Sequence, residues 1–186
     1  MRSIVNSIDV LCDNPGLPPG LFLYLCFSGG SEECAAAGLI IISMEYLKSW
    51  FRGFEQGIAD LQPQQREVLF RACAVNCVHG GPFGLYRSLF EAAEGDLDRF
   101  FVKIDELEGV RGESVCAGRE YNLCFEACSC ALHRAGCVNT PMLCECSRQS
   151  VLYVMSEFWP DRKFGVEVRA SILRGAYECV LNVRVE

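Results

Sequence analysis

The sequence has no excess of positive charge. Its 186 residues include 17 lysines and arginines against 24 aspartates and glutamates, which gives a net charge of −7 at pH 7. Acidic and basic residues are mixed along the whole chain, so no basic stripe is available to neutralise phosphate groups. We therefore expect no nucleic acid partner.

The sequence also lacks a long apolar run. Two apolar stretches near the N-terminus, 21–27 and 35–44, are shorter than the roughly 20 residues that a bilayer crossing requires. Acidic residues and three prolines within the first 19 positions break the pattern of a signal peptide. We expect a cytoplasmic protein without a membrane span.

Cysteine, by contrast, is abundant, with thirteen residues in the chain. Disulfide frameworks are typical of short secreted domains with an even number of cysteines. This chain is longer, is expected to remain in a reducing cytosol and has an odd number. The sequence therefore favours free thiols, which bind metals, act as nucleophiles or pack as small apolar side chains.

The pattern of apolar residues predicts one α+β domain over 1–186, because 51% apolar content can fill a single core. We divide it into an N-terminal helical extension, 1–60, and a cysteine-rich α+β core, 61–186. Three- and four-residue apolar spacing predicts helices over 32–54, 62–78, 85–93, 96–107 and 147–158. Alternating patterns predict a strand over 121–131 and a C-terminal β-hairpin formed by 166–172 and 179–185.

Two C-x-C motifs and one C-x-x-x-C motif give the cysteines a pattern. Residues two apart in a strand, or four apart in a helix, face the same side, so each pair can present two sulfurs to one point. Tetrahedral zinc and Fe–S clusters both take four thiolates. The pattern predicts a zinc or Fe–S site, with catalytic or redox thiols and plain packing as alternatives, formed by Cys128, Cys130, Cys144, Cys146, Cys73 and Cys77.

Both histidines of the chain follow one of these pairs, His79 after Cys77 and His133 after Cys130. A histidine beside a thiol serves as a metal ligand or as the base that activates the thiol. If the protein is an enzyme, we therefore take Cys128, Cys144, His133 and His79 as the catalytic candidates.

Two arginines follow the motifs, Arg148 and Arg174. A guanidinium group binds a carboxylate through two parallel hydrogen bonds. We take both residues as candidates for binding a carboxylate ligand or cofactor, against the alternative of ordinary surface charge.

The C-terminal third resembles an uncharacterised cysteine-rich family found mainly in anaerobic bacteria. The resemblance covers about 65 residues and rests on a C-x-C strand, a second C-x-C opening a helix, and a hairpin with the pattern S-I-L-x-G-x-x-x-C. That family is similar to the L-2-amino-thiazoline-4-carboxylate hydrolase-like proteins. More distantly, it resembles the 4-vinyl reductase-like ligand-binding domains, whose relatives include transport-particle subunits and haem-based nitric oxide sensors.

This resemblance implies a helical layer on a small antiparallel sheet with an apolar pocket between them, and a homodimer, since the related domains often pair. It adds two functional hypotheses to metal binding. One is a hydrolase of non-peptide C–N bonds in small cyclic, thiazoline-like substrates, and the other is a non-catalytic ligand-sensing or partner-binding subunit. The chain departs from both patterns: Ser171 stands where the vinyl reductase-like hairpin usually has a cysteine, and the aspartate expected shortly after Cys144 is missing.

Overall fold

The structure, a computed structural model, describes residues 21–23 and 41–186, with side chains from Met44 onward. Its helices are α1 (Met44–Asp60), α2 (Pro63–His79), α3 (Phe83–Ala92), α4 (Leu97–Ile104), α5 (Ala131–Arg134) and α6 (Cys144–Phe158), with 3-10 turns η2 (Pro141–Leu143) and η3 (Ile172–Arg174). Its strands are β1 (Leu21–Leu23), β2 (Ile41–Ser43), β3 (Val110–Cys116), β4 (Glu120–Phe125), β5 (Phe164–Ala170) and β6 (Cys179–Val185).

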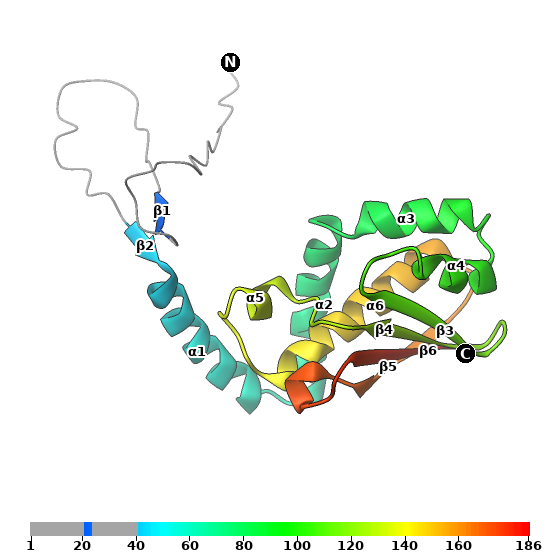
Figure 1. The fold of residues 1–186 in the computed structure, drawn as a ribbon. Coiled ribbons are helices and arrows are strands. Elements are labelled where there is room, and N and C mark those ends of the chain that lie inside the picture. Colours follow the sequence, from blue (N-terminus) through cyan, green and yellow to red (C-terminus); the bar gives the residue numbers. More distant parts are fainter. Residues whose placement is uncertain (1–20, 24–40) are drawn as a thin grey trace, which may run out of the picture.

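Four antiparallel strands form the main sheet in the order β3-β4-β6-β5, and β1 pairs with β2 separately. Helices α4 and α6 pack on one face of this sheet, and α2 runs alongside α6 (Figure 1). This arrangement confirms the predicted α+β class, the helical layer on an antiparallel sheet and the C-terminal hairpin of β5 and β6. The division into an extension and a core domain is not tested by it and stays a prediction.

Local sequence signals account for several helix ends. Pro63 begins α2, and the preceding Gln62 forms a capping box with Gln65, which accepts a hydrogen bond from the Gln62 N–H at 2.9 Å. Asp96 caps α4 by accepting a hydrogen bond from the Arg99 N–H at 2.8 Å. These caps satisfy backbone donors that the first helical turn leaves without partners.

Three predicted elements differ from the structure. The strand predicted over 121–131 ends at Phe125, so Cys128 and Cys130 lie in the following loop and not on a strand face. The helix predicted from Ser147 begins three residues earlier at Cys144. In the region predicted as a helix over 32–54, residues 32–40 lie outside the described residues, 41–43 form β2, and α1 starts at Met44.

The main core lies between the sheet and the helices. Aromatic side chains dominate it: the Phe101 ring stacks on Tyr121 at 4.3 Å between centroids, and the Phe158 ring contacts Phe90 at 4.9 Å. A smaller second cluster packs Ile58 of α1 against Phe70 and Val138. Within the described part of the chain, no helix combines the length and the apolar character needed to cross a membrane.

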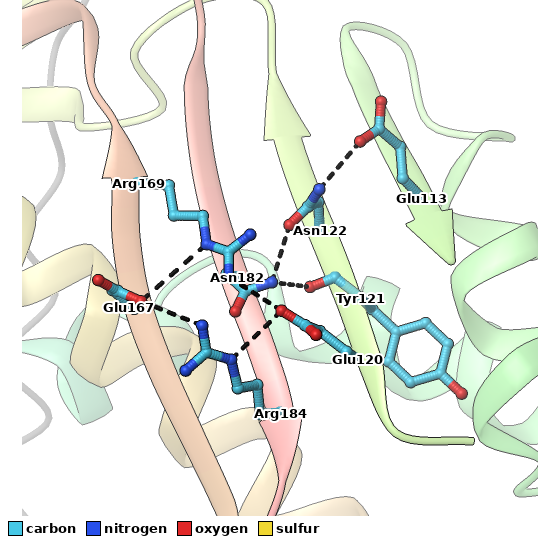
Figure 2. A network of polar contacts seen from close by, with 8 residues as sticks. All are labelled: Glu113, Glu120, Tyr121, Asn122, Glu167, Arg169, Asn182 and Arg184. Atoms are coloured by element: carbon cyan, nitrogen blue, oxygen red, sulfur yellow. Dashed lines mark hydrogen bonds and ion pairs between the residues drawn. The ribbon is translucent and has the colours of Figure 1, made fainter. Parts of the chain in front are cut away.

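The opposite face of the sheet is polar. Figure 2 shows a network of side chains that crosses the strands, in which Glu120 accepts from Arg169 at 2.9 Å and from Arg184 at 3.2 Å. The buried Asn182 donates to Asn122 at 2.9 Å, and Asn122 donates to Glu113 at 3.1 Å. Among the described elements, the helical layer therefore covers the apolar face of the sheet and not this polar one.

Candidate functional site

An apolar pocket of about 290 Å³ lies between the helices and the inner face of the sheet. It is lined from α2, α3, α4, β4 and α6 by residues that include Val78, Tyr86, Phe100, Leu123, Val151 and Met155. The pocket is at the small end of the usual range for ligand sites, and its lining is mostly apolar, as such sites require. It matches the pocket that the family resemblance implied.

The pocket has two chemically different ends along α6. Its α6 lining runs from Cys146 to Met155, which corresponds to about 14 Å of helix length at 1.5 Å per residue. Near the Met155 end, the Phe100 ring faces Phe158 at 6.3 Å between centroids. The other end is formed by the first turns of α6 and the loop before α5, where the cysteines lie.

Three thiols line this second end: Cys77 from α2, Cys130 from the loop and Cys146 from α6. Burial, and to a smaller extent the charges of the neighbouring Cys77, Cys73 and Cys130 thiolates, raise the pKa of the Cys146 thiol to about 12. The structure thus brings Cys73, Cys77 and Cys130 within electrostatic reach of Cys146. A thiol with so high a pKa is protonated at neutral pH and is a poor nucleophile.

Tyr86 supplies a polar group to the pocket. Burial raises the pKa of its phenol to about 12. Within the part of the chain that the structure describes, no side chain or carbonyl accepts a hydrogen bond from its hydroxyl group. A neutral phenol in an apolar pocket is a donor for a ligand that carries an acceptor atom.

A second group of thiols surrounds a much smaller cavity of about 20 Å³, lined by Cys128, Cys144 and Cys179, with Cys130 shared between the two cavities. The buried Cys144 sulfur lies 3.0 Å from the Ser171 hydroxyl, and the Ile172 N–H donates to the Cys179 sulfur at 3.4 Å. Burial raises the pKa of the Cys128 thiol as well. A cavity of this size holds about one water molecule and no organic ligand.

The six predicted metal ligands are therefore divided between two neighbouring places. Cys77 and Cys146 line the pocket, Cys128 and Cys144 line the small cavity, and Cys130 borders both. Cys73 is exposed and lies outside the pocket, near enough to Cys146 to affect its pKa. Across the described residues, no three cysteine, histidine, aspartate or glutamate side chains are placed to hold one metal ion. Metal binding by these thiols stays a prediction, and it would require side chains to rotate toward one point.

Neither histidine forms a hydrogen bond with a thiol among the described residues. His79 Nε2 lies 2.8 Å from the Tyr153 hydroxyl, and its ring packs against Phe83 at 4.5 Å between centroids. His133 Nδ1 lies 3.2 Å from the Val138 carbonyl oxygen. The pairing of either histidine with Cys128 or Cys144 as base and nucleophile stays a prediction.

The two arginines that are candidates for binding a carboxylate border the same groove. Arg148 of α6 and Arg174 of η3 line one open groove of about 470 Å³, and Arg66 of α2 lines it too. This groove is separate from the apolar pocket, with which it shares no lining residue.

Sequence reasoning did not identify Tyr86, Phe100, Val151 or Arg66 as site residues. An aromatic or β-branched residue that lines a pocket has the same helical spacing as one that fills the core, so the sequence carries no signal that separates them. Arg66 was missed because it lies on α2, 82 residues before Arg148 in the chain.

Comparison with known proteins adds little beyond the fold. No protein-family model and no curated protein matches this chain. An H-NOX protein from S. oneidensis, in its Fe(II)NO ligation state, is similar in structure with 12% identity, a TM-score of 0.42 and coverage of 78% of this chain and 77% of the other.

A trafficking protein particle complex subunit 3 from Naegleria fowleri, covalently bound to palmitic acid, is similar with 11% identity, a TM-score of 0.40 and coverage of 77% of this chain and 95% of the other. These weak neighbours are of the two kinds that the distant resemblance named. The cysteine-rich, hydrolase-like and vinyl reductase-like families themselves find no support from a sequence match. Likeness at this level carries no inference about function.

Proposed function

We propose that this chain binds a small, predominantly apolar molecule in the pocket between α2, α6 and the sheet, and that it does no chemistry on that molecule. The observation that carries the proposal is the cavity of about 290 Å³ with its apolar lining. Natural cores are packed to the density of organic crystals, so a void of this size inside the main core is costly unless a ligand fills it.

The lining also limits the chemistry of the ligand. A charged ligand would lose its hydration in this pocket and would find no acidic or basic side chain of opposite charge in return. The polar groups of the lining are thiols, hydroxyls and one phenol, from Cys77, Cys130, Cys146, Ser129, Ser147, Ser150 and Tyr86. The expected ligand is neutral and compact, with one acceptor atom for the Tyr86 hydroxyl.

Filling the pocket tests this function. The probe is prodan, a neutral naphthalene dye with one carbonyl acceptor. We expect Val151→Trp to weaken its binding by at least about tenfold, since the indole occupies the space that the dye needs. Tyr86→Phe should weaken it by about two- to tenfold through the loss of one hydrogen bond. Dye fluorescence titration measures both.

Val102→Trp is the matched control, because Val102 on α4 is 69% exposed and lies outside the pocket. It should bind the dye like the unchanged chain. Far-UV circular dichroism and thermal melting establish that each variant is folded. Equal dye affinity in folded Val151→Trp and unchanged chains would contradict the proposed function.

A second candidate function is thiolate metal binding, with zinc or an Fe–S cluster as the metal group. The observation that favours it is the proximity of Cys77, Cys73 and Cys130 to Cys146, whose pKa their charges raise in addition to burial. These four differ from the set of two C-x-C pairs, since Cys128 and Cys144 border the other cavity. The thiol hydrolase has no comparable support from the described contacts and stays a prediction.

Zinc titration tests this candidate. Because zinc binds the thiolate and the Cys146 pKa is raised to about 12, we expect zinc affinity to increase and proton release to be measurable as pH is raised from about 7 to about 8.5. Cys146→Ser should lower the affinity at least about tenfold, whereas Cys116→Ser, an exposed cysteine on β3, should not. Anaerobically purified protein that is folded, free of zinc, iron and sulfide, and unable to bind added zinc would exclude the candidate.

A further inference from the structure

Strand β5 is an edge of the main sheet, since β6 is the one described strand that pairs with it. The backbone N–H of Glu186 donates to the Lys163 carbonyl at 2.9 Å, which makes these two residues a hydrogen-bonded pair of the ladder. Hydrogen-bonded and non-hydrogen-bonded pairs alternate in an antiparallel ladder. Gly165 and Glu167 therefore direct their backbone groups toward β6, and Val166 and Val168 direct theirs away from the sheet.

The groove of about 470 Å³ runs along this edge. Val166, Glu167 and Val168 line it from β5, and residues of α2, η2, α6 and η3 line it from the opposite side. The described chain supplies no hydrogen-bond partner for the outward N–H and C=O groups of Val166 and Val168. An unpaired strand edge is a template on which another extended segment can form a strand.

Arginines give the groove its charge. The Arg174 guanidinium has no hydrogen bond and no ion pair with any described residue, although its backbone N–H donates to the Ser171 carbonyl at 2.9 Å. Arg148 directs Nε and Nη2 to Glu145, at 3.0 and 2.7 Å, and Arg66 directs one guanidinium nitrogen to the Leu61 carbonyl. Both keep further N–H groups for a ligand, since a guanidinium has five.

The two acidic residues of the groove are already paired. Glu145 is held by Arg148, and Glu167 lies 3.5 Å from Arg184 on the polar face of the sheet (Figure 2). The Arg174 charge is therefore uncompensated. A carboxylate matches the fork of hydrogen-bond donors that a free guanidinium presents, and a second arginine beside it adds to the attraction.

We propose that this groove binds an extended peptide segment that carries a carboxylate, and that the peptide adds to the sheet as a strand beside β5. Its main chain pairs with the outward groups of Val166 and Val168, and its carboxylate, from an acidic side chain or a free C-terminus, lies at Arg174. Pairing of main chains supplies affinity in such complexes, and the charged contact selects the partner. The site is independent of the apolar pocket.

The test uses a synthetic pool of N-acetylated random octapeptides with free C-terminal carboxylates, equilibrated with the full chain and identified by mass spectrometry after filtration. We expect enrichment of peptides with β-branched residues and a carboxylate, at least about fivefold above that obtained with Arg174→Gln, in line with the loss of a charged hydrogen bond. Arg52→Gln, an exposed arginine on α1, is the matched control and should retain the enrichment, as should Val151→Trp.

N-methylation of the best peptide then separates strand pairing from charge alone. Methylating one set of alternate residues removes the N–H groups that face β5 and should lower affinity at least about tenfold, whereas methylating the other set should have little effect. The proposal would be overturned if the Arg174→Gln variant enriched carboxylate peptides as strongly as the unchanged chain does. It would also be overturned if neither methylation pattern changed the affinity of the best peptide. A dimer of the free chain that excludes the peptide would overturn it too, because a second copy would then occupy the edge.

Discussion

Gly112→Ala is expected to lower the free energy of unfolding by at least about 3 kcal/mol, beyond the usual cost of overpacking, because the added methyl group meets backbone atoms. A Cβ atom at Gly112 would lie 2.0 Å from the Phe101 carbonyl oxygen and 2.9 Å from its carbon. The strand β3 and helix α4 must therefore separate to accept it. Urea unfolding followed by circular dichroism measures the loss.

Gly57→Ala is the matched control for this substitution. Gly57 lies inside α1, and nothing lies within 4 Å of a Cβ atom built on it. Alanine is the better helix former by roughly 0.5–1 kcal/mol, so this variant should be as stable as the unchanged chain or slightly more stable. If Gly112→Ala proved as stable as Gly57→Ala, α4 would not pack against β3 as described.

Phe158→Ala is expected to cost about 3–5 kcal/mol of stability, the range for removal of a buried aromatic ring. Phe158 is 6% exposed and joins three helices of the main core. Its ring lies 5.6 Å from Phe83 and 4.9 Å from Phe90, both on α3, and 6.3 Å from Phe100 on α4.

Tyr177→Ala provides the comparison, since Tyr177 in the β5–β6 connection is fully exposed. Its stability should stay within about 0.5 kcal/mol of the unchanged chain. Folded Phe158→Ala should also bind the dye more weakly in the fluorescence titration, because the Phe158 ring packs against Phe100, which lines the aromatic end of the pocket. A loss of less than about 1 kcal/mol for Phe158→Ala would place α6 outside the main core.

The pocket and the groove give α6 two roles. One side of the helix lines the pocket with Cys146, Ser147, Ser150, Val151, Val154 and Met155. The other side lines the groove with Glu145 and Arg148. A helix presents residues three and four apart on one face, so a single helix can serve both sites without sharing a side chain. The two proposed ligands can therefore be tested separately.

Local patterns were sufficient for much of the fold. The alternation of Val166 and Val168 and of Leu181 and Val183 predicted the C-terminal hairpin, because one face of each strand is buried. Pro63 marked the start of α2 for an equally local reason, since its fixed φ suits a first helical turn.

Local patterns failed where the alternation of side chains continued past the end of an element. Tyr121, Leu123 and Phe125 alternate as predicted on β4, but β6 offers no partner residue to β4 beyond the Phe125–Cys179 pair. The strand therefore ends there, and Cys130 instead precedes the short helix α5. Strand β3 was not predicted, because its residues are mostly exposed or half-buried and lack clear alternation.

The sequence by itself determined which residue types are available for function: thirteen cysteines, two histidines and the pair Arg148 and Arg174. Only the tertiary structure decided which of them meet. Packing of α2 against α6 joins Cys77 with Cys146, and the turn of the hairpin brings Ser171 and Cys179 to Cys144 and Cys128. The Cys144 and Cys146 side chains, two residues apart in sequence, thereby line different cavities, because long-range packing, and not spacing along the chain, fixes where a side chain points.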